Sequence, residues 1–190
     1  RTTSLAAYLR KNSAALAAAQ IWASEDPDNL NAHRTAADLL MRVGDLEAAI
    51  VHLEEVKRLG GLANFGRFAF QAANLNEESR TALLEGVSRM LQDYPDDEQL
   101  KFSKAVLLEQ NGDLEEALLI ADELLVDKRN INVVILKVNA LKNLEREAEA
   151  IGFLQQMLAE LPENRRLRLI FARFLFESED LDGARAQYEI

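Results

Sequence analysis

The 190-residue sequence contains no cysteine, only three prolines and eight glycines, and two histidines. Without cysteine there can be no disulfide, no thiol catalysis and no thiolate metal site. With so few prolines and glycines, and no Ser/Gly-rich or Pro-rich stretch, no flexible linker separates independent domains. His33 and His52 lack the HExxH spacing of a zinc site. We therefore expect one continuous domain with no metal and no cofactor.

Positive charge is also scarce, since 22 Lys and Arg face 32 Asp and Glu for a formal net charge of -10. Nucleic acids and anionic membrane surfaces attract basic proteins, so neither is the expected partner. No apolar run approaches the ~20 residues that cross a bilayer, and the first residues lack the apolar core of a signal peptide. We expect no membrane insertion by this segment.

What the sequence does contain is a repeat. Pro27 and Pro95 lie 68 residues apart, which is twice the 34-residue period of a helix-turn-helix repeat. The phrases that follow the two prolines align without a gap. Their matching residues are Ala37 and Ala105, Leu40 and Leu108, Gly44-Asp45 and Gly112-Asp113, and Ala49 and Ala117. The period predicts antiparallel helix pairs.

Apolar residues at three- and four-residue spacing predict the buried stripe of the second helix in each pair. The stripes are Ala15, Leu16, Ala19 and Trp22; Leu46, Ala49, Ile50, Leu53 and Val56; and Leu114, Ala117, Leu118, Ala121, Leu124 and Leu125. Gly44 and Gly112 are expected to end a helix in the left-handed conformation, with Asp45 and Asp113 capping the next helix.

With these residues the chain resembles a tetratricopeptide repeat protein, whose pattern has a small residue at position eight, a bulky one at eleven, Gly-Asp at the helix turn, Ala at twenty and Pro at thirty-two. Ala37, Ala105 and Ala172 match position eight, Leu40, Leu108 and Leu175 match eleven, and Ala49, Ala117 and Ala184 match twenty. The resemblance implies an all-α fold, a right-handed superhelix of antiparallel helix pairs.

We divide this single solenoid, residues 1–190, into a partial unit 1–27, full units at about 30–61, 62–97, 98–130 and 131–164, and a truncated unit 165–190. Two units are degenerate. Gly60-Gly61 replaces the proline before the stripe of Phe65, Phe68, Ala69 and Ala72, and Leu144-Glu145-Arg146-Glu147 replaces Gly-Asp-Leu.

Neither end of the chain shows a polar capping repeat, so we expect a segment of a longer array that tends to self-associate. Phe171, Phe174 and Leu181 are expected near the open face.

The chemistry-bearing side chains favour structural roles. His33 stands at a position where bulky residues pack, so we expect it to be in the core or partly buried, whereas His52 is expected at the surface. The acidic turns around Pro27 and Pro95 lack the glycine and distal Glu of a calcium loop and read as helix caps. We predict no catalytic residue and no enzyme activity.

In this family the first helices of successive pairs line a concave groove. The resemblance implies a partner-binding groove of Arg34, Asp38, Arg42, Phe70, Asn74, Phe102, Val106, Gln110, Leu136, Arg166, Leu169, Arg173 and Phe176. Our hypothesis is that Phe102, Val106 and Leu136, flanked by Arg166 and Arg173, receive an apolar helix or extended segment of a partner protein. The alternative is that these side chains only pad neighbouring helices. The Lys/Asn clamp by which some relatives hold chaperone tails is absent.

Three functions fit the sequence. The first is a protein-protein interaction scaffold or adaptor that binds a protein or peptide. The second is a regulatory or substrate-delivery extension of an enzyme such as a protease or glycosyltransferase, and the third is a self-assembling structural module. The Ala- and Leu-rich units are similar to bacterial arrays, several of which are envelope scaffolds or lipoproteins. The compartment, whether bacterial periplasm, envelope or cytoplasm, stays open.

Overall fold

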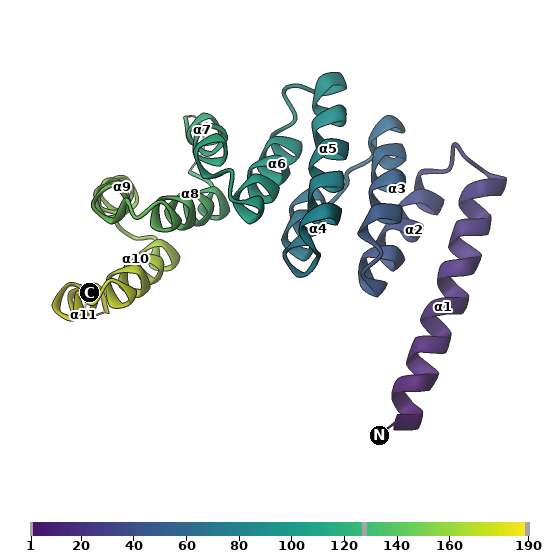
Figure 1. Ribbon diagram of the computed structural model, residues 1–190, viewed down its shortest axis with the longest axis horizontal. Coiled ribbons are helices and arrows are strands. Elements are labelled where there is room, and N and C mark those ends of the chain that lie inside the picture. The colour runs from purple at the N-terminus through teal and green to yellow at the C-terminus, as the bar shows by residue number, and fades with distance from the viewer. Residues whose placement is uncertain (1, 127–128, 189–190) are drawn as a thin grey trace. The chain divides into compact units, whose positions relative to one another are not determined.

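The computed structural model describes residues 2–126 and 129–188, with side chains from residue 13 onward in those ranges (Figure 1). Every regular element in these ranges is a helix, which confirms the predicted all-α class. The chain divides into two compact units, Arg1–Asn111 and Gly112–Ile190. This division falls between the two helices of the predicted repeat 98–130, so each compact unit is described by itself.

The first compact unit is built of helices that pack in chain order. Its elements are α1 (Thr2–Glu25), α2 (Leu30–Val43), α3 (Leu46–Arg58), α4 (Phe65–Gln71), the 3-10 turn η1 (Ala72–Asn74), α5 (Glu77–Asp93) and α6 (Glu98–Asn111). Helix α2 packs between α1 and α3, and α6 packs against α4 and α5. We refer to α2, α4 and α6 as first helices of their repeats and to α3 and α5 as second helices.

The second compact unit repeats this arrangement. Its elements are α7 (Leu114–Leu125), α8 (Ile131–Asn143), α9 (Glu147–Glu160), α10 (Arg165–Glu177) and α11 (Leu181–Tyr188). Helix α8 packs against α7, α9 and α10, and α10 also packs against α9 and α11. Here α8 and α10 are first helices, whereas α7, α9 and α11 are second helices.

The predicted stripes form the core. All five stripe residues of α3 are buried, and so are Ala117, Leu118, Ala121 and Leu125 of α7. In the degenerate second repeat, Phe65, Phe68, Ala69 and Ala72 are buried as well. Small residues at the crossings let the helices approach closely, while the larger apolar residues fill the space between them.

Helix α1 differs from the predicted stripe. It is one continuous helix in which, from residue 13 onward, the buried residues are Ala19 and Ala23, while Trp22 is 43 % exposed and Ala15 is exposed. The helix packs against α2, where alanines allow close approach. The bulky Trp22 side chain therefore lies beside this contact rather than in it.

Asparagine or aspartate caps the start of α2, α4, α5, α6, α8 and α10. The side chains of Asn29, Asn64, Asn76, Asp97, Asn130 and Asn164 each accept a hydrogen bond from a backbone N–H in the first turn of the following helix. These bonds satisfy donors that a helix start leaves without a partner. The acidic turns near Pro27 and Pro95 are therefore caps, as predicted.

The turns inside the repeats follow the predicted geometry only in part. Gly44 and Gly112 adopt φ of 85° and 90°, in the left-handed region, as expected. Asp45 accepts a hydrogen bond from the Ala48 N–H, whereas Asp113 makes no such bond. At the equivalent turns after α8 and α10, the left-handed residues are Glu145 and Glu179, at φ of 59° and 64°.

The end of the described chain corrects one expectation. Phe171 and Phe174 are each 4 % exposed and belong to the core, because α9 and α11 pack on α10. Leu181 is 61 % exposed, as predicted. No helix among the described residues is both long enough and apolar enough to cross a bilayer.

Candidate partner-binding surface

The two histidines form a pair that the sequence did not predict. His33 is 7 % exposed, and its Nδ1 lies 3.0 Å from Nδ1 of His52, while its Nε2 lies 3.0 Å from the carbonyl oxygen of Pro27. A carbonyl only accepts, so a neutral His33 donates from Nε2 and accepts at Nδ1 from the His52 Nδ1–H. His33 is buried as predicted, but His52 is half-buried rather than a surface residue. The pair joins α2, α3 and the preceding turn.

This environment disfavours charge on His52. Burial lowers the pKa of His52, and the neighbouring His33 lowers it further, against a smaller opposing effect of Glu55. The described residues contain no group of three or more His, Cys, Asp or Glu side chains arranged to hold a metal. Both histidines therefore have structural partners.

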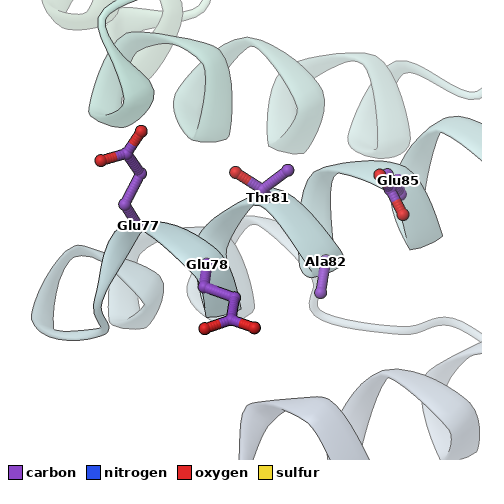
Figure 2. A pocket seen from close by; sticks show the side chains of 5 residues that line it. All are labelled: Glu77, Glu78, Thr81, Ala82 and Glu85. Carbon is purple, nitrogen blue, oxygen red and sulfur yellow. The ribbon is translucent and has the colours of Figure 1, made fainter.

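A surface hollow on α5 is lined mainly by acidic residues. It is lined by Glu77, Glu78, Thr81, Ala82 and Glu85, and Figure 2 shows Glu77 and Glu78 pointing to opposite sides of the helix. All five residues come from α5, and none is a cation or a histidine. Carboxylates that diverge along one helix, with no base or cation between them, give neither an acid-base pair nor a closed ligand cage.

The predicted groove residues of the first compact unit lie mostly at the surface. Arg34, Asp38 and Arg42 are exposed on α2, and Asn74 is exposed on η1. Arg34 donates to the side-chain oxygen of Asn31 in the same helix. These residues are free to meet a partner.

Two other members are turned inward. Val106 is 2 % exposed, so it belongs to the core and not to a groove. Gln110 is half-buried and donates from Nε2 to the carbonyl oxygen of Ala69 at 3.0 Å, which ties α6 to α4.

An aromatic pair stands at the centre of this surface. Phe70 on α4 is 52 % exposed and meets Phe102 on α6 edge to face, with ring centroids 5.8 Å apart at 66°. Phe102 itself is half-buried. A Cβ atom at Gly66 would lie 3.4 Å from the Phe102 ring, so the missing side chain leaves room for that ring beside α4. The structure thus fixes Phe102 as a support for the more exposed Phe70.

The register of the second compact unit corrects one predicted groove residue. The left-handed residues Gly112 and Glu145 mark equivalent turns, and Phe102 and Ile135 each lie ten residues earlier. Leu136 follows one residue later and is 5 % exposed, hence core. Strict 34-residue spacing from Phe102 places the equivalent position at 136, one residue too late, because Pro162 and its repeat come one residue early. Ile135, half-buried like Phe102, occupies the equivalent position instead.

A partly open cavity of about 200 Å³ lies between the first helices α8 and α10. It is lined by Ile135, Val138, Asn139, Lys142, Ile170, Arg173, Phe174 and Glu177. Of the predicted residues, Arg173 lines it, while Arg166, Leu169 and Phe176 are exposed on α10. Arg166 donates to the side-chain oxygen of Asn132 on α8 at 3.1 Å.

Charge is sorted between the helices of this unit. The first helices carry six basic residues, Lys137, Lys142, Arg165, Arg166, Arg168 and Arg173, against one acidic residue, Glu177. The second helices α7 and α9 carry seven acidic residues and no basic one, namely Glu115, Glu116, Asp122, Glu123, Glu147, Glu149 and Glu160. Net charge alone hid this separation, which appears only once the helices are assigned.

Comparison with known proteins identifies the architecture. Residues 144–189 match the tetratricopeptide repeat family. A TPR repeat-containing protein of Pseudomonas aeruginosa is 35 % identical over 172 residues, 90 % of this chain, although the chain spans only 29 % of that relative's length.

Solved structures agree on the fold. A tetratricopeptide repeat protein from Parabacteroides merdae superposes with a TM-score of 0.59 at 13 % identity, covering 98 % of this chain and 73 % of that one. YrrB, described as a TPR protein with an unusual peptide-binding site, gives a TM-score of 0.51 at 14 % identity, covering 90 % and 89 %.

Proposed function

Because this chain is a tetratricopeptide repeat protein, we propose that it is a non-catalytic scaffold or adaptor that holds a protein or peptide partner on its first helices. The observation that carries the proposal is the Phe70–Phe102 pair, in which a large aromatic ring is 52 % exposed on a first helix. Buried aromatic anchors dominate the energy of most protein interfaces. The peptide-binding site described for YrrB supports the same use of the fold.

The neighbours of Phe70 suit a binding surface better than a packing role. The Phe102 ring lies beside Gly66 and contacts the ring of Phe70 edge to face, so less side-chain entropy remains to be lost when a partner covers Phe70. Exposed Arg67, three residues before Phe70 on the same helix α4, adds polar donors beside the ring. A core-like contact with a polar rim is the usual anatomy of an interface.

In-cell photo-crosslinking tests this proposal. A benzoylphenylalanine probe replaces Phe70, and a matched probe replaces Val51, which is 57 % exposed on the second helix α3 of the same compact unit. We expect a discrete polypeptide crosslinked from position 70 and not from position 51. The purified partner should then bind the unlabelled chain, and Phe70→Ser should weaken that binding at least tenfold without changing the melting temperature.

The outcomes separate the candidate functions. Equal crosslinking from both positions, or none from position 70, would refute the first-helix surface as the working face. A product that contains a second copy of this chain would instead favour a self-assembling structural module.

A further inference from the structure

The cavity between α8 and α10 has a feature that neither the fold nor its packing requires. One carboxylate, that of Glu177, is held by two cations from two helices. Lys142 Nζ lies 2.6 Å from Oε2, and Arg173 Nε lies 2.7 Å from Oε1. Hydrogen bonds from Lys142 and Arg173 lower the pKa of Glu177, so the group is ionised at neutral pH. The cavity is thus already organised around a carboxylate.

We propose that this cavity is a subsite for an acidic segment of a partner protein, an inference that rests on the proposed function. A partner carboxylate binds Lys142 and Arg173, and an adjacent bulky apolar side chain of the partner enters the cavity. In the free chain, the carboxylate of Glu177 occupies the place of the partner carboxylate on these two cations.

Spare donors on the two cations make room for a second carboxylate. Within the described residues Arg173 uses only Nε, so its two terminal nitrogens have no partner, and its side chain is 79 % exposed. Lys142 has three N–H donors and uses one, and its side chain is 42 % exposed. The planar guanidinium suits bidentate binding of a carboxylate.

The rest of the cavity selects an apolar side chain. Ile135 and Val138 from α8 and Ile170 and Phe174 from α10 supply its apolar lining. Its volume of about 200 Å³ is smaller than the roughly 300–1,000 Å³ typical of small-molecule sites. That size suits one bulky side chain of a peptide better than a free metabolite.

The separation of basic first helices from acidic second helices makes an acidic partner complementary to the cavity. The first helices of this unit are basic, while α7 and α9 carry acidic residues alone. An acidic segment is therefore attracted to the cavity and repelled by the second helices, which gives orientation as well as affinity. A long polyanion such as nucleic acid would meet a chain of net charge -10, so we favour a short acidic stretch.

A display experiment with the whole chain tests the inference. A random 12-residue peptide library is selected on the wild-type protein, and labelled copies of the enriched peptides are titrated by fluorescence polarisation. We expect Asp or Glu next to Phe, Leu, Ile or Met among the enriched sequences. Arg173→Ala should weaken these peptides at least tenfold. The matched control is Arg165→Ala, which removes the same charge from the same helix outside the cavity and should change affinity less than threefold.

The role of Glu177 has its own readout. Glu177→Gln removes the competing carboxylate, and acidic peptides should then bind three- to tenfold more tightly, with unchanged helicity by circular dichroism. Unchanged or weaker binding would show that Glu177 is only a bridge between α8 and α10 and would overturn its assignment as a placeholder.

The two proposals can fail separately. Enriched peptides that lose affinity in Phe70→Ser but not in Arg173→Ala would overturn the acidic subsite and leave the scaffold proposal standing. Failure of any peptide to enrich, or enrichment without acidic residues, overturns the subsite. Tighter binding of single-stranded DNA than of acidic peptides would also overturn it in favour of a nucleic acid.

Discussion

Two glutamates hold backbone conformations that favour glycine, and replacing them should stabilise the protein. Glu145 and Glu179 end α8 and α10 at φ of 59° and 64°, where Gly44 and Gly112 stand in better-matched repeats. A non-glycine residue in the left-handed conformation costs roughly 1–2 kcal/mol. Glycine also increases the conformational entropy of the unfolded chain, which lowers the free energy of unfolding by about 0.4–1 kcal/mol. We expect Glu145→Gly to raise the free energy of unfolding by about 0.5–1 kcal/mol, and Glu179→Gly by a similar amount.

The substitutions remove no stabilising contact. Both side chains are exposed, and neither makes a hydrogen bond or an ion pair within the described residues. Removing one acid from a chain of net charge -10 also relieves repulsion, so Glu145→Gln serves as the charge control. That variant keeps the strained backbone and should change stability by less than about 0.5 kcal/mol.

Urea unfolding followed by circular dichroism at 222 nm supplies the measurement. Gly112→Ala gives the reverse experiment, because a Cβ there meets no neighbour and only the φ of 90° opposes it. It should destabilise by about 1 kcal/mol. If Glu145→Gly is no more stable than Glu145→Gln, the turn is not strained and the reasoning fails.

Three further predictions follow from buried groups. Because the pKa of His52 is lowered in the folded chain, the unfolded chain takes up a proton first as the pH falls. Stability is therefore full above about pH 6.5 and falls as the pH drops from there towards the folded pKa, by at most about 1.4 kcal/mol per pH unit. Urea titrations at pH 7.5 and 5.5 should show the loss, and His52→Gln should reduce it. Asp97 caps α6 and pairs with Lys57; Asp97→Ala should cost about 1–3 kcal/mol by the same assay. Leu136→Ala should cost about 2–4 kcal/mol, whereas Ile135→Ala at the cavity wall should cost less.

Specific results would contradict the His52 and Leu136 predictions, and the Asp97 prediction has its own pH window. A pH dependence that survives in His52→Gln would place the titrating group elsewhere. Burial raises the pKa of Asp97, but hydrogen bonds from Lys57 and the Leu100 and Gln99 N–H groups outweigh it and lower the pKa overall. The stability from Asp97 should therefore be present above about pH 4 and lost at lower pH, well separated from the histidine window. Equal losses for Leu136→Ala and Ile135→Ala would contradict the assigned register.

The sequence predicted the fold because buried positions repeat. Ala37, Leu40 and Ala49, like their counterparts one or more periods later, lie where helices cross, and only small or bulky apolar side chains fit there. The left-handed turn at Glu145 could not be predicted, because glutamate rarely adopts that conformation and no glycine marks the position. One misplaced position was enough to exchange Leu136 for Ile135.

The candidate site was harder to predict for the same physical reason. Phe70 is exposed, as a groove residue must be, whereas Val106 is buried, because the neighbouring helices pack more closely over Val106. The His33–His52 pair, 19 residues apart, needs the α2–α3 packing to become visible. Side-chain pairs of this kind form only when the helices pack, so the sequence alone does not reveal them.

This separation of core and surface positions bears on how a tetratricopeptide repeat surface can be adapted to a partner. Positions that fill the core are held by packing, so a change there costs stability before it alters binding. Ile135, Lys142 and Arg173 sit where the fold requires only a helix-compatible residue, and the two cations are at least two-fifths exposed. Changes at these residues can therefore reset charge and shape at the cavity while α8 and α10 keep their packing. Partner choice should follow Lys142, Arg173 and Glu177 rather than the repeat pattern.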